Sequence, residues 1–177
     1  MRTILGLLTA VGFLAVFSTV RAEPLAVGAQ APALTATTDA GTALDLGTVY
    51  PKGYTLVFFY PQAGSAEDIA LATGLGAVAK DLAAKGVTVI GVSVDDVATL
   101  KTFKEQNQLP FTLISDPDHA VIKAFGVPIS EQWGTGPRAM RQTFLIDKTG
   151  KVVWQDLKAG TKEQAAAVLK ALKDLGA

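Results

Sequence analysis

Cysteine is absent from all 177 residues of this chain. Its absence excludes disulfides, lipid attachment through cysteine and redox chemistry by a thiol of the chain itself. Packing alone must therefore hold the folded chain together. The chain's sulfur atoms belong to Met1 and Met140. We interpret Met140 as a loop or packing residue, because a thioether oxidises slowly and needs a separate reductase.

Histidine is nearly absent, with His119 as its one occurrence. A metal site of Asp116, Asp118 and His119 can be drawn. Asp-Pro-Asp before a helix is also ordinary turn and capping chemistry, so we predict no metal site. A hydrolytic triad of Ser65, His119 and an aspartate is disfavoured because Ser65 lacks the G-x-S-x-G motif. Glycine-rich phosphate-binding patterns are missing as well, and no cofactor is predicted.

An excess of one charge is also lacking, with 16 Lys and Arg against 16 Asp and Glu, and nothing in this balance indicates nucleic-acid binding. Residues 1–22 have the features of a signal peptide: Arg2, an apolar run over Ile4 to Val20, and Ala22 at the end. A membrane anchor is the alternative, but the run is at the short limit for a span. We therefore expect one domain at residues 23–177, without a membrane span, in a periplasmic or secreted location.

Short apolar runs alternate with helical patterns along that domain. Runs rich in Val, Phe and Ile predict strands at residues 56–60, 87–94, 111–115, 143–147 and 152–154. Helical spacing of apolar residues predicts a helix ending at Gly86, one behind Asp95-Asp96, and a last one opened by a Thr161-x-x-Gln164 capping box. This succession of strands and helices indicates an α/β domain with a largely parallel central sheet. Asp147-Lys148-Thr149-Gly150 adds an antiparallel hairpin, so the sheet is expected to be mixed and flanked by helices.

Several segments carry a resemblance to a known family. The segment at 54–68, Y-T-L-V-F-F-Y-P-Q-A-G-S-A-E-D, is an apolar strand that leads through a turn into a helix. Further matching words are V-G-A-Q-A-P-A-L at 27–34, V-T-V-I-G-V-S at 87–93, F-T-L-I-S-D at 111–116 and R-Q-T-F-L-I-D at 141–147. In order and spacing they resemble peroxiredoxins of the alkyl hydroperoxide reductase and thiol-specific antioxidant superfamily. The peroxiredoxin Q branch, also called bacterioferritin comigratory protein, is the most similar. The resemblance implies a thioredoxin-like fold and a monomer.

The resemblance also implies a pocket built for a reactive cysteine. Pro61 matches the proline that shields the active loop, and Ser65 stands where the family has a Thr whose hydroxyl binds peroxide. Arg141 matches the arginine that stabilises the thiolate. Asp68 replaces the peroxidatic cysteine, and Thr73 stands where many members of the branch keep a resolving cysteine. We predict that Pro61, Ser65, Asp68 and Arg141 form a vestigial pocket with no active catalytic residue.

Asp68 has two interpretations that can both hold. In the first, Ser65 caps the helix and Asp68, three residues on, returns a hydrogen bond at the positive end of the helix dipole. The second adds an ion pair with Arg141, which fixes an anion where the thiolate would be. Such a pair would keep the first helical turn folded around Asp68.

Two classes of function follow. A carboxylate cannot pass through a sulfenic acid, so we predict a non-catalytic binding or interaction module with an unknown small anion or protein as partner. The alternative, implied by the resemblance, is a thiol-dependent peroxidase that reduces hydrogen peroxide and alkyl hydroperoxides. The glycine-rich loop from Pro128 to Arg141 leads to the pocket arginine. We interpret Trp133 as packing this loop onto the core, with ligand contact as the alternative.

Overall fold

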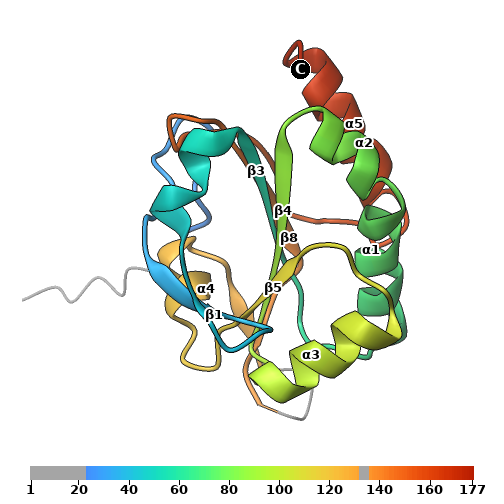
Figure 1. Ribbon diagram of the computed structural model, residues 1–177. Coiled ribbons are helices and arrows are strands. Elements are labelled where there is room, and N and C mark those ends of the chain that lie inside the picture. Colours follow the sequence, from blue (N-terminus) through green and yellow to red (C-terminus); the bar gives the residue numbers. More distant parts are fainter. Residues whose placement is uncertain (1–22, 132–135) are drawn as a thin grey trace, which may run out of the picture.

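The computed structural model describes residues 23–131 and 136–177 (Figure 1). Its main sheet has seven strands in the order β2-β1-β5-β4-β3-β8-β9. β3 pairs in parallel with β4, and β4 with β5, whereas the other pairs are antiparallel. The bounds are β1 Thr35–Thr38, β2 Ala43–Asp45, β3 Tyr54–Phe59, β4 Val87–Ser93, β5 Thr112–Ser115, β8 Gln142–Ile146 and β9 Val152–Asp156. The expected mixed sheet is confirmed. The predicted signal peptide at 1–22 and Trp133 lie outside the described residues.

Helices cover both faces of this sheet. Figure 1 shows α1, α2 and α5 stacked along one side of the sheet and α4 on the other. The helices are α1 Ala66–Ala77, α2 Ala79–Ala84, α3 Val97–Gln106, α4 Ala120–Ala124 and α5 Gln164–Asp174, with 3-10 turns η1 Leu46–Thr48 and η2 Tyr50–Lys52. A small hairpin of β6 Ile129–Ser130 and β7 Arg138–Ala139 precedes β8. None of the helices in the described part of the chain is long and apolar enough to span a bilayer.

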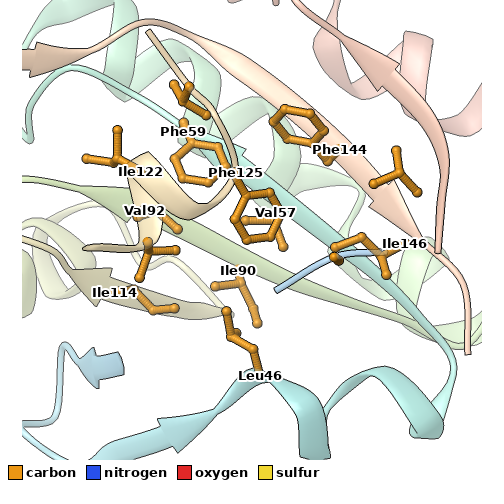
Figure 2. Close-up of a cluster of buried hydrophobic side chains, with 14 of the residues drawn as sticks. Leu46, Val57, Phe59, Ile90, Val92, Ile114, Ile122, Phe125, Phe144 and Ile146 are labelled. Atoms are coloured by element: carbon orange, nitrogen blue, oxygen red, sulfur yellow. The ribbon is translucent and has the colours of Figure 1, made fainter. Parts of the chain in front are cut away.

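Alternation along the central strands builds two cores. On β3, Leu56 and Phe58 pack with the side chains of α1, α2, α3 and α5, whereas Val57 and Phe59 belong to the cluster on the opposite face. This is the two-residue period of a strand buried on both sides. Figure 2 shows the second cluster, in which Phe59, Phe125 and Phe144 meet with ring centroids 5.2 to 5.9 Å apart. Apolar side chains therefore pack on both faces of the central strands, and the strand ends are the places where polar functional groups can lie.

The hairpin between β8 and β9 forms as predicted. Asp147 Oδ1 accepts hydrogen bonds from the backbone N–H groups of Thr149 and Lys151 at 2.8 and 3.1 Å. Gly150 has a φ of 81°, a left-handed conformation that favours glycine. The turn therefore fixes the register of the last two strands.

The sequence predicts one continuous helix that ends at Gly86, and this prediction is wrong because the structure has two helices there. The predicted helix is divided at Val78, whose φ and ψ of −101° and 6° leave the helical region, so that α1 and α2 are separate. The five-residue α4, behind Asp116-Pro117-Asp118, follows a strand that the apolar pattern did predict. It contains only Val121 and Ile122 as buried residues. Such a short apolar pattern does not identify a helix.

The predicted capping box at Thr161 is also wrong. α5 begins at Gln164, with Glu163 at the N-cap and no side-chain capping bond. Gln164 is 1% exposed, so its amide lies in the interior and does not return to the helix start. Burial of that side chain outweighs the local capping pattern.

Candidate functional site

The loop after β3 delivers a capping serine to the start of α1. Pro61 is buried, and Gly64 takes a φ of 93°, which reverses the chain before Ser65. Ser65 is the N-cap of α1, and its Oγ accepts a hydrogen bond from the Asp68 backbone N–H at 3.1 Å. The cap predicted from the sequence therefore forms, and it places Asp68 in the first turn.

Asp68 and Arg141 form the ion pair that the second interpretation describes. Arg141 Nε donates to Asp68 Oδ1 at 2.8 Å. Asp68 Oδ2 accepts the Ser65 hydroxyl at 2.6 Å and a longer bond from the Gln62 backbone N–H at 3.4 Å. The Asp68 side chain has no exposed surface, whereas that of Arg141 is 20% exposed. Three of the four predicted site residues are thus joined by direct hydrogen bonds.

A second carboxylate holds the same loop from the neighbouring strand. Asp95, just beyond β4, accepts the Ala63 backbone N–H at 2.6 Å and the Ser93 hydroxyl at 2.8 Å, both on Oδ2. Its other oxygen lies 3.7 Å from Arg138 Nη1. Gln62 and Ala63 therefore donate successive backbone N–H groups to two different carboxylates. Each carboxylate is paired with an arginine of the segment that leads into β8.

Tyr60 lies beneath this loop at the end of β3. It is 1% exposed and stacks on Phe58 with ring centroids 5.6 Å apart. Burial raises the pKa of its phenol well above the ordinary value, and the charges of Asp95 and Asp68 act in the same direction. The phenol is therefore neutral at physiological pH and is no source of a reactive anion.

The hydrogen-bond donors of the site are occupied by the site's own carboxylate, Asp68. Asp68 takes the position that the resemblance gives to the thiolate, and Arg141 and Ser65 already donate to it. Thr73 is exposed on α1, with its hydroxyl bonded to the Ile69 carbonyl at 2.7 Å. A small molecule can contact Asp68 only if the first turn of α1 moves, because no part of that side chain is exposed.

The residues of the other candidate sites have other partners in the structure. Asp116 accepts the backbone N–H groups of Val121 and Ile122, and thus caps α4. Burial nevertheless raises the pKa of Asp116 above its ordinary value. His119 has a φ of 58°, and its ring lies 3.4 Å from the Pro137 carbonyl. Among residues 23–131 and 136–177, no three His, Asp or Glu side chains are grouped to hold a metal ion.

The sequence patterns did not point to Asp95, Ser93 or Arg138 as site residues. A signal was available, since Ser93 and Asp95 end a strand that is predicted to run parallel to β3, and the carboxyl ends of parallel strands meet at one edge. The sequence pattern at Asp95-Asp96 indicates only the start of a helix. Asp96 does have that role, and its Oδ1 accepts the Thr99 backbone N–H at 2.7 Å.

Solved structures share this fold over most of the chain. Peroxidoxin BcpB from Mycobacterium tuberculosis superimposes with a TM-score of 0.78 at 25% identity, over 84% of this chain and 97% of the other. Bacterioferritin comigratory protein from Xanthomonas campestris gives 0.77 at 26% identity, over 86% and 100%. The predicted thioredoxin-like fold of peroxiredoxin type is confirmed.

Curated relatives agree with these structures. The chain is 36% identical to Peroxiredoxin Bcp of Escherichia coli over 161 residues, which cover 86% of this chain and 98% of the relative. It is 36% identical to a protein of Coxiella burnetii named putative peroxiredoxin bcp, over 136 residues, 75% of this chain and 89% of the relative.

These names correct the functional prediction. The comparisons contradict the non-catalytic binding or interaction module, because the relatives are named as peroxiredoxins, and they favour the alternative of a peroxide-reducing oxidoreductase. The predicted branch is confirmed, since Bcp and peroxiredoxin Q proteins are among the relatives. The model of the AhpC/TSA family matches residues 27–155, and the chain belongs to that family.

Proposed function

We propose that this protein is an oxidoreductase of the peroxiredoxin type that reduces hydroperoxides with electrons from a separate thiol. The observation that carries the proposal is the match of nearly the whole domain to proteins named peroxiredoxins, at 36% identity to the Escherichia coli relative. The Xanthomonas campestris protein is described by its alkyl peroxide reduction activity. Organic hydroperoxides are therefore included in the substrate class that we propose for this chain.

The thiol has to be separate because the chain has no cysteine. In the overall reaction, one hydroperoxide and two thiols give an alcohol, a water molecule and a disulfide. The hydroperoxide is reduced by two electrons, and the thiols are oxidised by two. Arg141 is the partly exposed cation at the edge of the site. A guanidinium stabilises the charge that develops on oxygen when the O–O bond breaks.

The setting that we propose for this activity is outside the cytoplasm. Residues 1–22 are proposed as a signal peptide and residues 23–177 as the domain, acting as a monomer in the periplasm or after secretion, without nucleic-acid partners. Comparing the intact mass of protein in whole cells and in the periplasmic fraction tests this setting. Mature protein that starts at Glu23 and is enriched in the periplasm is the expected result, and full-length protein confined to the cytoplasm would contradict it.

A peroxide-consumption assay tests the activity. Purified protein spanning 23–177 is mixed with hydrogen peroxide or cumene hydroperoxide and with dithiothreitol or a thioredoxin system. We expect peroxide to disappear faster than in the matched thiol blank. A rate equal to the blank with both peroxides and both reductants would overturn the proposal.

Asp68→Cys is the informative companion. We expect this variant to exceed the wild type, because it restores a thiol beside Ser65 and Arg141 at the N-terminus of a helix. If Asp68→Cys consumes peroxide while the wild type is no faster than the thiol blank, the fold can support peroxide reduction but the wild-type protein lacks the proposed function.

A further inference from the structure

A second site is lined by Met140 and Gln142, the two residues on either side of Arg141. It is a cavity of about 590 Å³ whose other lining residues are Pro128, Ile129 and Leu157 together with Ser130, Glu131 and Lys158. Ile129, Met140 and Leu157 are 37%, 42% and 39% exposed. The volume is in the range of small-molecule sites. Exposed large apolar side chains that gather in one hollow favour contact with an apolar group.

Gln142 also lines this cavity, and it gives an independent sign of a ligand. It is 4% exposed, and its Oε1 has no hydrogen-bond partner among the described residues. A buried acceptor without a donor is costly, and in native structures it points to a missing partner. The O–H of a hydroperoxide is such a donor once the amide turns toward the cavity.

Met140 provides the reactive atom at the same place. Apart from Met1, it carries the chain's only sulfur. Its backbone N–H donates to the Pro128 carbonyl at 2.9 Å, which fixes the residue to the cavity wall. Met140 lies between β7 and β8 and is 42% exposed, so of the two interpretations, loop or packing residue, the loop is the one the structure has, and much of the side chain is open to solvent.

We propose that this cavity binds an organic hydroperoxide and that Met140 takes its terminal oxygen. This inference rests on the proposed function and names a site and a substrate class for it. A sulfur lone pair attacks the terminal oxygen, the S–O bond forms as the O–O bond breaks, and the alkoxide receives the hydroperoxide proton and leaves as alcohol. Sulfur is oxidised by two electrons to the sulfoxide, and the peroxide is reduced by two. A thiol-dependent methionine sulfoxide reductase returns the thioether and releases water.

Peptide mapping by mass spectrometry tests the proposal. The protein spanning 23–177 is treated with cumene hydroperoxide or hydrogen peroxide, and formation of Met140 sulfoxide is timed against N-acetylmethionine amide in the same tube. With cumene hydroperoxide, we expect Met140 to react at least about tenfold faster than the free amide, because a bound reactant has a high effective concentration. Hydrogen peroxide has no apolar group to bind and should give a much smaller ratio.

Two matched variants separate binding from simple exposure. Leu157→Asp places a charge in the cavity and should abolish the advantage of cumene hydroperoxide. Leu175→Asp changes a leucine of similar exposure, 41%, that does not line the cavity, and should leave the advantage unchanged. Equal effects of the two variants, or a Met140 rate equal to that of the free amide, would overturn the inference. Thiol-dependent peroxide turnover that persists in Met140→Leu, measured with thioredoxin and a methionine sulfoxide reductase both present, would leave the proposed function standing while removing Met140 from it.

Discussion

Asp68 is a charged residue with no exposed surface, and its neighbours replace the water that it has lost. Arg141 Nε lies at 2.8 Å, the Ser65 hydroxyl at 2.6 Å, and the helix start adds its own positive end. A buried charge is costly unless it is paired and hydrogen-bonded. The ion pair therefore adds little stability compared with an apolar replacement of both residues. Removing only one partner, in contrast, destabilises the folded state strongly.

Arg141→Met should destabilise the protein strongly. The variant leaves the Asp68 carboxylate buried without its cation, which typically costs about 3–5 kcal/mol. Urea unfolding followed by circular dichroism measures the loss. Lys170→Met is the control, because the Lys170–Asp174 pair is exposed on both sides and should change stability by less than about 1 kcal/mol. Adding Asp68→Asn to Arg141→Met should recover part of the loss, and no recovery would show that the pair is not the cause.

Asp116 should make the protein less stable as the pH rises. Burial raises the pKa of its carboxyl in the folded state, in spite of the bonds from Ile122 and Val121. The folded state then binds more protons than the unfolded state between the unfolded pKa, about 3.9, and the raised folded value. Stability from this group is complete below that window and falls as the pH increases through it. The unfolding free energies of wild type and Asp116→Asn are compared from pH 4 to 7. As the pH rises, the wild type should lose stability relative to the variant. A gain of wild-type stability relative to the variant would contradict the raised pKa.

At the scale of elements, the loop between β3 and α1 is fixed by two carboxylates on two neighbouring elements. Asp68 on α1 holds the Gln62 N–H, and Asp95 after β4 holds the Ala63 N–H. Because each carboxylate is in turn paired with an arginine near β8, three segments far apart in the sequence are tied at one edge of the sheet. The first turn of α1 is therefore expected to stay folded.

Hydrogen exchange resolved to single amides tests this arrangement. Asp68→Ala should speed exchange at Gln62 and in the first turn of α1, and Asp95→Asn should speed exchange mainly at Ala63, because each loses a different acceptor. Asp96→Ala is the matched control, since it removes the cap of α3, which costs about 1 kcal/mol, and the Asp96 carboxylate accepts from Thr99 and not from the loop. Fast exchange of the loop in the wild type, or no change in Asp68→Ala, would remove the basis for a fixed first turn.

The sequence predicts β3, β4, β5, β8 and β9 because each of these strands has a strong apolar run. Residues 87–94 and β4 differ by one residue, and the hairpin at Asp147 follows from its turn residues. The extended segments β1 and β2 escape prediction because they alternate small polar and apolar residues such as Thr35 and Ala36. These two residues pair with β2, and the end of β1 pairs with β5, through tertiary contact. Local pattern cannot supply that information.

The site is predictable where the family pattern names a residue. Ser65, Asp68 and Arg141 are brought together as the resemblance implied. Asp95 and Arg138 were not predicted because their meeting depends on the strand order, which brings the end of β4 beside the loop after β3. A single sequence gives the order of the elements along the chain but not which of their ends are neighbours.

At the scale of the whole molecule, residues 23–31 tie the sheet edge to α4. Leu25 N–H donates to the Phe125 carbonyl at 3.1 Å, and Gly28 N–H donates to the Val152 carbonyl at 2.7 Å. Ala31 N–H donates to the Gly150 carbonyl at 2.8 Å, and Ala31 itself is buried. The segment thus joins the β8–β9 hairpin to the end of α4, whose Phe125 belongs to the cluster in Figure 2. A fold without disulfides depends on such contacts.

Removing this segment should therefore destabilise the domain, whereas removing residues 1–22 should not. A chain that begins at Pro32 loses several backbone hydrogen bonds worth about 1 kcal/mol each, and the entropy regained by the unfolded chain offsets only part of them. We expect a net loss on the order of 3 kcal/mol, which lowers the Tm of a domain of this size by about 10 °C. Calorimetry of chains beginning at Glu23 and at Pro32 measures the difference. Equal Tm values would place the start of the folded domain after Ala31 and reject the proposed boundary at residue 23.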